Sequence, residues 1–153
     1  MELAAACVTR SIELPDTADG VWESLATVEG LRGWLGDTVD VDLVPGGAGL
    51  VVDGATRRRV VVTEVDAGRS LGFVWWDEAA PEAASTVRIS LEPADPADEA
   101  AGTNVVVTER IVGAARATVG AATVHDLAVE AAAGWDARLR ALVGAPAHSA
   151  ACV

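Results

Sequence analysis

Apolar and polar residues alternate along much of the first two thirds of the chain, and this pattern predicts β-strands. The clearest case is Val39-Asp40-Val41-Asp42-Leu43, where strict alternation sends every apolar side chain to one face of the strand. Weaker forms of the pattern occur in six further runs: Val8 to Leu14, Leu50 to Asp53, Arg59 to Val65, Leu71 to Trp76, Thr86 to Leu91 and Thr103 to Ile111. Turns containing Gly or Pro separate most of these runs, so we expect an antiparallel meander.

Helical spacing replaces the alternation in two places. After the first strand, Asp16 or Thr17 is a competent N-cap for a short apolar helix around Val21, and a second short apolar run covers Leu31 to Leu35. Near the other end, apolar residues from Val124 to Leu142 recur with the period of one long amphipathic helix. This order of elements predicts an α+β domain with about six or seven strands and a long C-terminal helix.

The chain has the length of one domain, and we expect that domain to span residues 1–146, with residues 147–153 as a flexible tail. Residues 93–102 are acidic and lack apolar periodicity, so they are predicted to form an exposed loop. A single helix lying across a strongly curved sheet seldom fills the concave side completely. The sequence therefore predicts an internal cavity, closed at one end by the two short helices.

Composition narrows the range of partners. Hydrophobic residues make up 51% of the chain, which is enough for a sizeable core, and the net charge of -12 opposes binding to nucleic acid or to an anionic membrane surface. No run of apolar residues is long enough for membrane insertion. The chain has no Lys and no Tyr, which excludes Schiff-base and tyrosyl chemistry.

The two cysteines and two histidines offer no framework for a disulfide network or a metal site. Cys7 and Cys152 lie at opposite ends of the chain, and neither they nor His125 and His148 have the spacing of metal ligands. We therefore expect no metal, no cofactor and a reducing, cytoplasmic location.

Alternation also selects the residues that would line the cavity. With one choice of face per strand, together with one Trp from the second short helix and three residues of the long helix, the predicted ligand-binding set is Trp34, Val41, Leu43, Val61, Thr63, Leu71, Phe73, Trp75, Val87, Ile89, Val105, Val107, Glu109, Ala128, Ala131 and Trp135. Trp75 and Trp135 could stack on a flat ligand, or they could simply fill the core. Trp34 could gate the entrance, or it could hold a helix against the sheet.

Three polar residues are candidates for catalysis. Glu109 is aimed inward by its strand, where desolvation would suit it to acid-base work, although it could instead pair with Arg88 or Arg110. His125 could shuttle a proton or be a solvated flank residue, and Arg88 could steer a proton transfer. The basic run Arg57 to Arg59 could bind an anionic group, or it could be the solvated charge of a hairpin.

Several short motifs, in this order along the chain, resemble the SRPBCC or START-like superfamily with its helix-grip fold. The matching features are Pro15 with Val21-Trp22, Leu31 to Trp34, Leu43-Val44-Pro45-Gly46-Gly47, Leu71-Gly72-Phe73-Val74-Trp75, Ser85-Thr86-Val87, Gly102-Thr103, and Gly134-Trp135 with Leu139 and Leu142. Within the superfamily, the chain looks most like bacterial relatives of the C-terminal domain of the heat-shock-protein ATPase activator. The resemblance implies a curved antiparallel sheet wrapped around the C-terminal helix.

The resemblance also implies a range of functions. The first is binding of a hydrophobic natural product, polyketide or lipid for transport, sequestration or self-resistance, including resistance to enediyne-type polyketides. The alternatives are a cofactor-independent polyketide cyclase or aromatase, and a co-chaperone-type interaction module. Because inward polar residues are few and Tyr is absent, we expect binding rather than catalysis, by a monomer or weak homodimer.

Overall fold

Most of the described residues belong to one antiparallel sheet. The computed structural model describes residues 6–79, 81, 84–95, 97–111, 118–119, 122–123, 133–139 and 148–149. The sheet has the order β10-β1-β7-β6-β5-β4-β3-β2. Its strands are β1 (Ala6–Leu14), β2 (Thr38–Val41), β3 (Ala48–Asp53), β4 (Thr56–Asp66), β5 (Ser70–Asp77), β6 (Ser85–Asp95), β7 (Asp98–Ile111) and β10 (His148–Ser149). A separate small hairpin pairs β8 (Thr118–Val119) with β9 (Ala122–Thr123).

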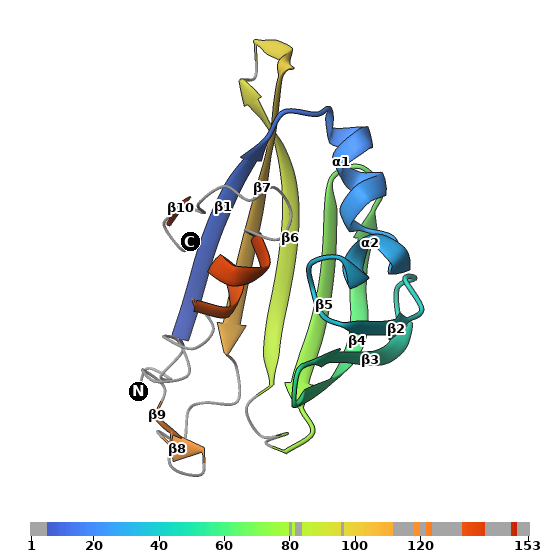
Figure 1. The fold of residues 1–153 in the computed structure, drawn as a ribbon, viewed down its shortest axis with the longest axis vertical. Coiled ribbons are helices and arrows are strands. Elements are labelled where there is room, and N and C mark those ends of the chain that lie inside the picture. The colour runs from blue at the N-terminus through green and yellow to red at the C-terminus, as the bar shows by residue number, and fades with distance from the viewer. Residues whose placement is uncertain are drawn as a thin grey trace.

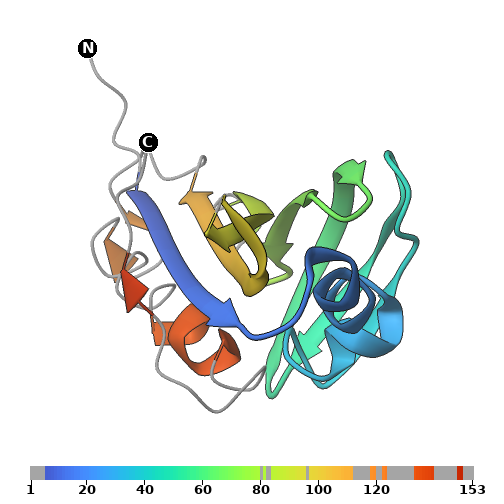
Figure 2. The same cartoon turned by 90° about the horizontal axis from the view of Figure 1, so that it is seen from above.

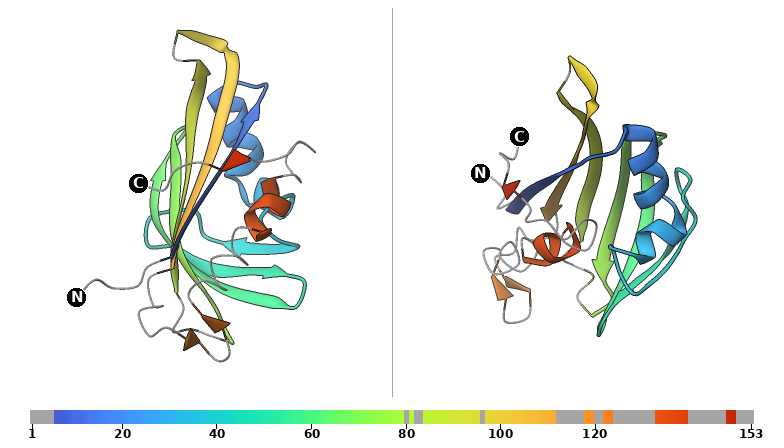
Figure 3. Two further views of the ribbon diagram at one scale, coloured as in Figure 1. Left: turned by 90° about the vertical axis from the view of Figure 1, so that its left-hand side faces the viewer. Right: turned by 45° about the horizontal axis from the view of Figure 1, so that its top comes forward.

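The helices all lie on one side of this sheet. Helix α1 (Ala18–Leu25) and helix α2 (Val28–Arg32) follow β1, and a third helix covers residues 133–139. Figure 1 shows α1 and α2 over one end of the sheet, and Figure 2 shows the sheet curving around them and around helix 133–139. The edge-on view in Figure 3 places the helices on the same, concave face. Within the described part of the chain, no helix is long and apolar enough to cross a membrane.

Both short helices begin at a threonine that caps the first turn. The hydroxyl of Thr17 accepts a hydrogen bond from the Gly20 amide at 3.3 Å, and that of Thr27 accepts one from the Gly30 amide at 3.0 Å. Such a cap satisfies a backbone donor that the helix itself leaves without a partner. Thr17 is one of the two N-cap residues that the sequence predicts, so the predicted start of α1 is confirmed.

The prediction of a loop over residues 93–102 is wrong, because β6 extends to Asp95 and β7 begins at Asp98; the predicted exposure does hold for Pro93, Asp95 and Ala97. Asn104 pairs with Glu92, and after a register shift at Pro93 the ladder continues to Asp95 and Asp98. The apolar alternation disappears here because this end of the hairpin extends beyond the main part of the sheet (Figure 1) and has no core to cover. Backbone hydrogen bonds form the ladder without a hydrophobic face.

The predicted inward face of β4 is also wrong by one residue. Val60 and Val62 are buried, while Val61 is half-exposed and Thr63 is exposed. The run Val60-Val61-Val62 is apolar on both faces, so alternation alone could not choose between them. Pairing with β5 decides it, since Val60 lies opposite Trp75 and Val62 opposite Phe73, both inward. A register shift between Val62 and Glu64 then returns Val65 to the core side.

This assignment gives a direct prediction for stability. Val62→Ala should lower the free energy of unfolding by about 2 kcal/mol, because the side chain is almost fully buried and leaves a cavity. Thr63→Ala should change it by less than about 0.5 kcal/mol, because that side chain is exposed. Urea unfolding of both variants measures the difference. If Thr63→Ala lowers the free energy of unfolding more than Val62→Ala does, Thr63 faces the core and this assignment is wrong.

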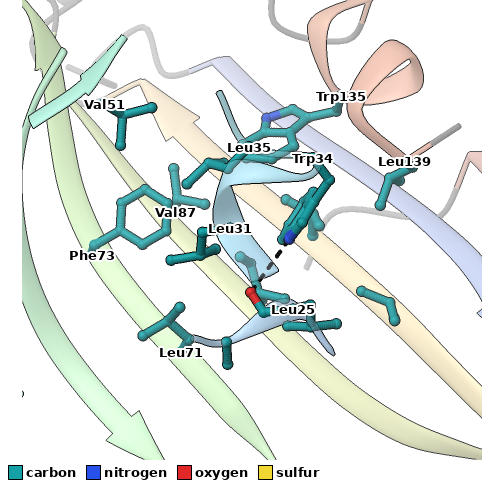
Figure 4. Packing of buried hydrophobic residues seen from close by; sticks show 14 of the residues in the cluster. Leu25, Leu31, Trp34, Leu35, Val51, Leu71, Phe73, Val87, Trp135 and Leu139 are labelled. Atoms are coloured by element: carbon teal, nitrogen blue, oxygen red, sulfur yellow. Dashed lines mark hydrogen bonds between the residues drawn. The ribbon is translucent and has the colours of Figure 1, made fainter. Parts of the chain in front are cut away.

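The core lies between the concave face of the sheet and the helices. Val21 and Leu25 of α1, Leu31 of α2 and Leu35 pack there against the sheet. Trp34, between α2 and β2, is also buried and donates its indole N–H to the Leu25 carbonyl at 3.3 Å, as Figure 4 shows. This bond ties the turn after α2 to the end of α1.

The two ends of the chain show two further departures from expectation. Cys7, in β1, is disulfide-bonded, which the expected reducing location does not predict; the other cysteine of the sequence, Cys152, lies outside the described residues. Within the predicted flexible tail, His148 and Ser149 form β10, which pairs with Ser11 and Arg10 of β1. These two residues are therefore part of the sheet.

Candidate functional site

A buried carboxylate links the sheet to helix 133–139. Glu109 of β7 is 6% exposed, and each of its carboxylate oxygens accepts one hydrogen bond from a tryptophan. Trp75 of β5 donates to Oε2 at 2.8 Å, and Trp135 of helix 133–139 donates to Oε1 at 2.9 Å. Alternation along β5 and β7 puts Trp75 and Glu109 on the same inward face, with the β6 strand between them.

Four aromatic side chains gather around this carboxylate, and we call them the aromatic cluster: Trp34, Phe73, Trp75 and Trp135. The rings of Trp75 and Trp135 are stacked, with centroids 5.6 Å apart and planes 19° from parallel. Trp34 lies 6.3 Å from Trp135, and Phe73 meets Trp75 edge-on at 5.3 Å. Glu109 accepts a hydrogen bond from each indole N–H of the stacked pair, and these two bonds fix the orientation of both rings.

Arg138 covers the aromatic cluster from the helix. It is 8% exposed, and its guanidinium carbon lies 5.3 Å from the Trp75 ring centroid and 4.9 Å from that of Trp135. Its Nε donates to the Leu35 carbonyl and its Nη2 to Asp53 Oδ2, both at 3.2 Å. Burial, followed by the nearby charge of Arg58, lowers the pKa of Arg138, while Asp53 and Glu109 oppose this shift. The guanidinium stays charged at neutral pH.

A cleft opens beside Arg138. It has a volume of about 260 Å³ and is open to solvent rather than enclosed. Its lining comes from α2 and the turn after it, from β3 and from helix 133–139: Arg32, Gly33, Trp34, Gly36, Asp37, Asp53, Gly134, Ala137 and Arg138. The volume lies just below the roughly 300 Å³ at which pockets for drug-sized ligands begin. The cleft can therefore hold a small molecule or one end of a larger one.

Most of the ligand-binding residues expected from alternation do face the concave side. Eight of the predicted strand residues are buried there: Val41, Leu71, Phe73, Trp75, Val87, Ile89, Val105 and Val107. Glu109, Trp34 and Trp135 join them, whereas Leu43 is partly buried and packs against the core. Val61 and Thr63 are the two strand residues placed on the wrong face. Ala128 and Ala131 lie outside the described residues.

The three catalytic candidates are not brought together among the described residues. Arg88 lies on the opposite face of the sheet from Glu109, with a side chain 61% exposed, and its Nε is 3.4 Å from Glu64 Oε2. Glu109 does face inward, as its strand predicts, and the alternative in which it pairs with Arg88 is wrong. His125 lies outside the described residues. Both oxygens of Glu109 already accept hydrogen bonds, so this carboxylate serves to position the two indoles.

The basic run on β4 divides between the two faces of the strand. Arg57 and Arg59 point outward and share Glu78, with Nε to oxygen distances of 2.9 and 2.8 Å. These two bonds lower the pKa of Glu78. Arg58 points inward, and its guanidinium carbon lies 4.7 Å from the Trp75 ring centroid. Only this middle arginine therefore reaches the aromatic cluster.

Of the residues that line the cleft, sequence analysis predicted Trp34 and missed the others, among them Arg138 and Asp53. Arg138 follows Trp135 at a spacing of three, which places both on one face of the helix, and an arginine on an apolar helical face is a detectable signal. Asp53 ends a strand, and its proximity to Arg138 arises from tertiary packing alone. Among the described residues, no group of three or more His, Cys, Asp or Glu side chains is placed to hold a metal ion.

The curved antiparallel sheet around a C-terminal helix is the helix-grip fold of the SRPBCC superfamily. The model of the "Activator of Hsp90 ATPase homolog 1-like protein" family matches residues 16–145, and the chain belongs to this family. No curated protein matches the chain.

Solved structures share the fold at low sequence identity. DynU16, from the dynemicin biosynthetic locus, is 20% identical with a TM-score of 0.72; the match covers 92% of this chain and 49% of DynU16, so the chain spans about half its length. CalU16 from Micromonospora echinospora is 18% identical with a TM-score of 0.68, covering 92% of this chain and 82% of that one. The Aha1 dimer from Colwellia psychrerythraea is 16% identical with a TM-score of 0.66, covering 89% and 92%.

Proposed function

We propose that this domain binds a hydrophobic small molecule at the cleft between α2, β3 and helix 133–139. The observation that carries the proposal is the aromatic cluster, which Glu109 and Arg138 hold rigid directly behind the cleft. Small-molecule sites combine an aromatic or apolar surface with convergent polar groups, and here Arg32, Asp37, Asp53 and Arg138 are the charged side chains of the cleft lining. Trp34 belongs to both the cluster and the cleft lining, so it would be the first ring that a ligand touches.

The proposed ligand is a natural product of the polyketide class, with enediynes included, or a lipid. The similarity to DynU16, a protein of a biosynthetic locus, supports the natural-product reading, and the fold is consistent with small-molecule binding. Transport, sequestration and self-resistance are the roles that fit a binding protein without turnover. An internal cavity that encloses the whole ligand stays a prediction.

The other readings have less support. A cyclase would need acid-base groups in contact with the ligand, but Glu109 is buried behind the cleft lining and Arg88 is on the outer face. A co-chaperone role has support from the family match and from the fold shared with the Colwellia protein, and a homodimer from that protein's dimer, but no contact of the described residues favours either. Cytoplasmic location stays a prediction. The disulfide at Cys7 argues against it, because disulfides are rare in reducing compartments.

Native mass spectrometry of the protein purified from its own cells tests the binding proposal. The expected result is a retained apolar molecule, seen as the difference between the native and denatured masses. An empty protein whose Trp fluorescence stays constant across a panel of polyketides and lipids would contradict it.

A variant that fills the cleft tests the location of the site. Ala137 is exposed and lines the cleft, so Ala137→Trp should weaken ligand binding at least about tenfold while leaving the core unchanged. Ala133→Trp is the matched control, because Ala133 is an exposed residue of the same helix outside the cleft lining. Equal affinities of the two variants in a fluorescence titration would move the ligand elsewhere.

A further inference from the structure

We propose that Arg138 is the specificity-determining residue of the cleft, and that it selects ligands whose flat ring carries an oxygen acceptor, with a carboxylate bound most tightly. This inference rests on the proposed function, because it gives the chemistry of the ligand bound at the same cleft. Four features of the site carry it: a donor of Arg138 that has no partner among the described residues, the burial of Arg138, its own positive charge and the neighbouring rings.

One nitrogen of the Arg138 guanidinium has no hydrogen-bond partner among the described residues. A guanidinium has N–H donors on three nitrogens, and here Nε donates to the Leu35 carbonyl while Nη2 donates to Asp53. The third nitrogen, Nη1, donates to no oxygen of the described residues, and it lies beside Gly134, where an added Cβ would be 3.0 Å from it. Both Arg138 and Gly134 line the cleft, so Nη1 is accessible to a bound molecule.

The burial of Arg138 makes this donor selective. Arg138 is more than nine-tenths buried, so few water molecules can reach its guanidinium. An oxygen atom of a ligand that accepts a hydrogen bond from Nη1 therefore replaces hydration that this group has lost. A ligand without an acceptor would cover Nη1 and leave it without a partner. Sites built around a buried polar group reject such analogues strongly.

The preference for a carboxylate over a neutral acceptor comes from the guanidinium itself, because the charges around the cleft are balanced. Arg32 lines the cleft and Arg58 lies over Trp75. Two acids also line the cleft: Asp37, which accepts a hydrogen bond from the Gly54 amide, and Asp53, the partner of Arg138. The charge of Glu109 acts on Arg138 as well. Hydrogen bonds between a guanidinium and an anion are about twice as strong as neutral ones.

The aromatic cluster supplies the preference for a flat ring. Trp34 lines the cleft and lies 6.3 Å from Trp135, which in turn contacts the Arg138 guanidinium. A conjugated ring placed against Trp34 would direct a substituent toward Nη1. Gly134 carries no side chain that would block this approach.

Three naphthalene probes of similar shape test the inference. 2-Naphthoate carries a carboxylate, 2-acetylnaphthalene a neutral carbonyl and 2-ethylnaphthalene no acceptor. Affinities are measured by following the Trp indole and Arg Nε signals in ¹H–¹⁵N NMR spectra of the intact protein. We expect 2-naphthoate to bind at least about tenfold more tightly than 2-ethylnaphthalene, with 2-acetylnaphthalene between them, and to shift the Trp34 and Arg138 signals.

Two variants test the role of Arg138 itself. Arg138→Lys keeps the charge but loses the guanidinium geometry, and it should reduce the affinity for 2-naphthoate about tenfold while changing that for 2-ethylnaphthalene less than twofold. Gly134→Ala keeps Arg138 but places a methyl group against Nη1, so it should also reduce the affinity for 2-naphthoate about tenfold. This second variant provides the test if Arg138→Lys does not fold. Arg88→Lys, on the outer face, is the control and should change neither affinity.

The outcomes separate this inference from the proposed function. If all three probes bind equally well, or if both variants weaken all of them alike, recognition by Arg138 is wrong and the binding function stands. If no probe shifts any indole signal, both proposals fail for this cleft.

Discussion

Glu109→Gln should lower the free energy of unfolding by about 3 kcal/mol and move the Trp fluorescence maximum to longer wavelength. The glutamine keeps one acceptor oxygen but places an amide N–H₂ opposite the indole N–H of Trp75 or Trp135, so one buried donor loses its partner. It also removes the negative charge that balances the buried Arg138 guanidinium. Urea unfolding monitored by fluorescence measures both effects.

The matched control for this variant is Glu64→Gln on the outer face. Glu64 lies 3.4 Å from Arg88, and both side chains are largely exposed, so the expected change in the free energy of unfolding is below about 0.5 kcal/mol. If Glu109→Gln costs no more than this control, the carboxylate does not hold the two indoles in solution.

Trp135→Ala should be the most destabilising single change in the aromatic cluster, at about 4 kcal/mol. The side chain is fully buried, stacks on Trp75, contacts Trp34 and lies beneath the Arg138 guanidinium. Its removal leaves a cavity and also takes a hydrogen bond from Glu109. Trp135→Phe keeps a ring and should cost roughly 2 kcal/mol, because only the indole donor and part of the volume are lost.

Trp76→Ala is the control for the loss of a tryptophan. Trp76 follows Trp75 on β5 but faces the other side of the sheet and is only partly buried. We expect it to lower the free energy of unfolding by about 1 kcal/mol. A loss from Trp135→Ala as small as that from Trp76→Ala would mean that helix 133–139 is not docked on the cluster.

The two experiments also bear on function. If Glu109 positions the indoles, Glu109→Gln should weaken ligand binding as well as stability, because Trp135 would no longer hold Trp34 and Arg138 in place beside the cleft. A catalytic Glu109 would show a different result, namely retained binding with lost turnover. The structure favours the first outcome, since each oxygen already has an indole partner.

Strict alternation was the most informative pattern in the sequence. It correctly placed Phe73, Trp75, Val105, Val107 and Glu109 on the inward face, because a two-residue period leaves only two choices. In β7 the polar residues Asn104, Thr108 and Arg110 also mark the outer face. The order of elements likewise predicts the α+β class, and the resemblance to the SRPBCC superfamily implies the helix-grip fold. The alternation gave a wrong prediction where neighbouring positions do not differ in polarity. This is the case in the all-apolar run of β4 and in the hairpin that extends from the sheet.

What the sequence by itself determined is therefore the sheet, the start of the first helix and the inward direction of Glu109, since local spacing and capping chemistry decide these. The tertiary structure alone decided which groups meet. The two indoles reach Glu109 from β5 and from a helix after β7, and Arg138 joins Leu35 and Asp53 across more than 80 positions. No local pattern encodes such contacts, because they arise only when the helix packs on the curved sheet and buried donors must find acceptors.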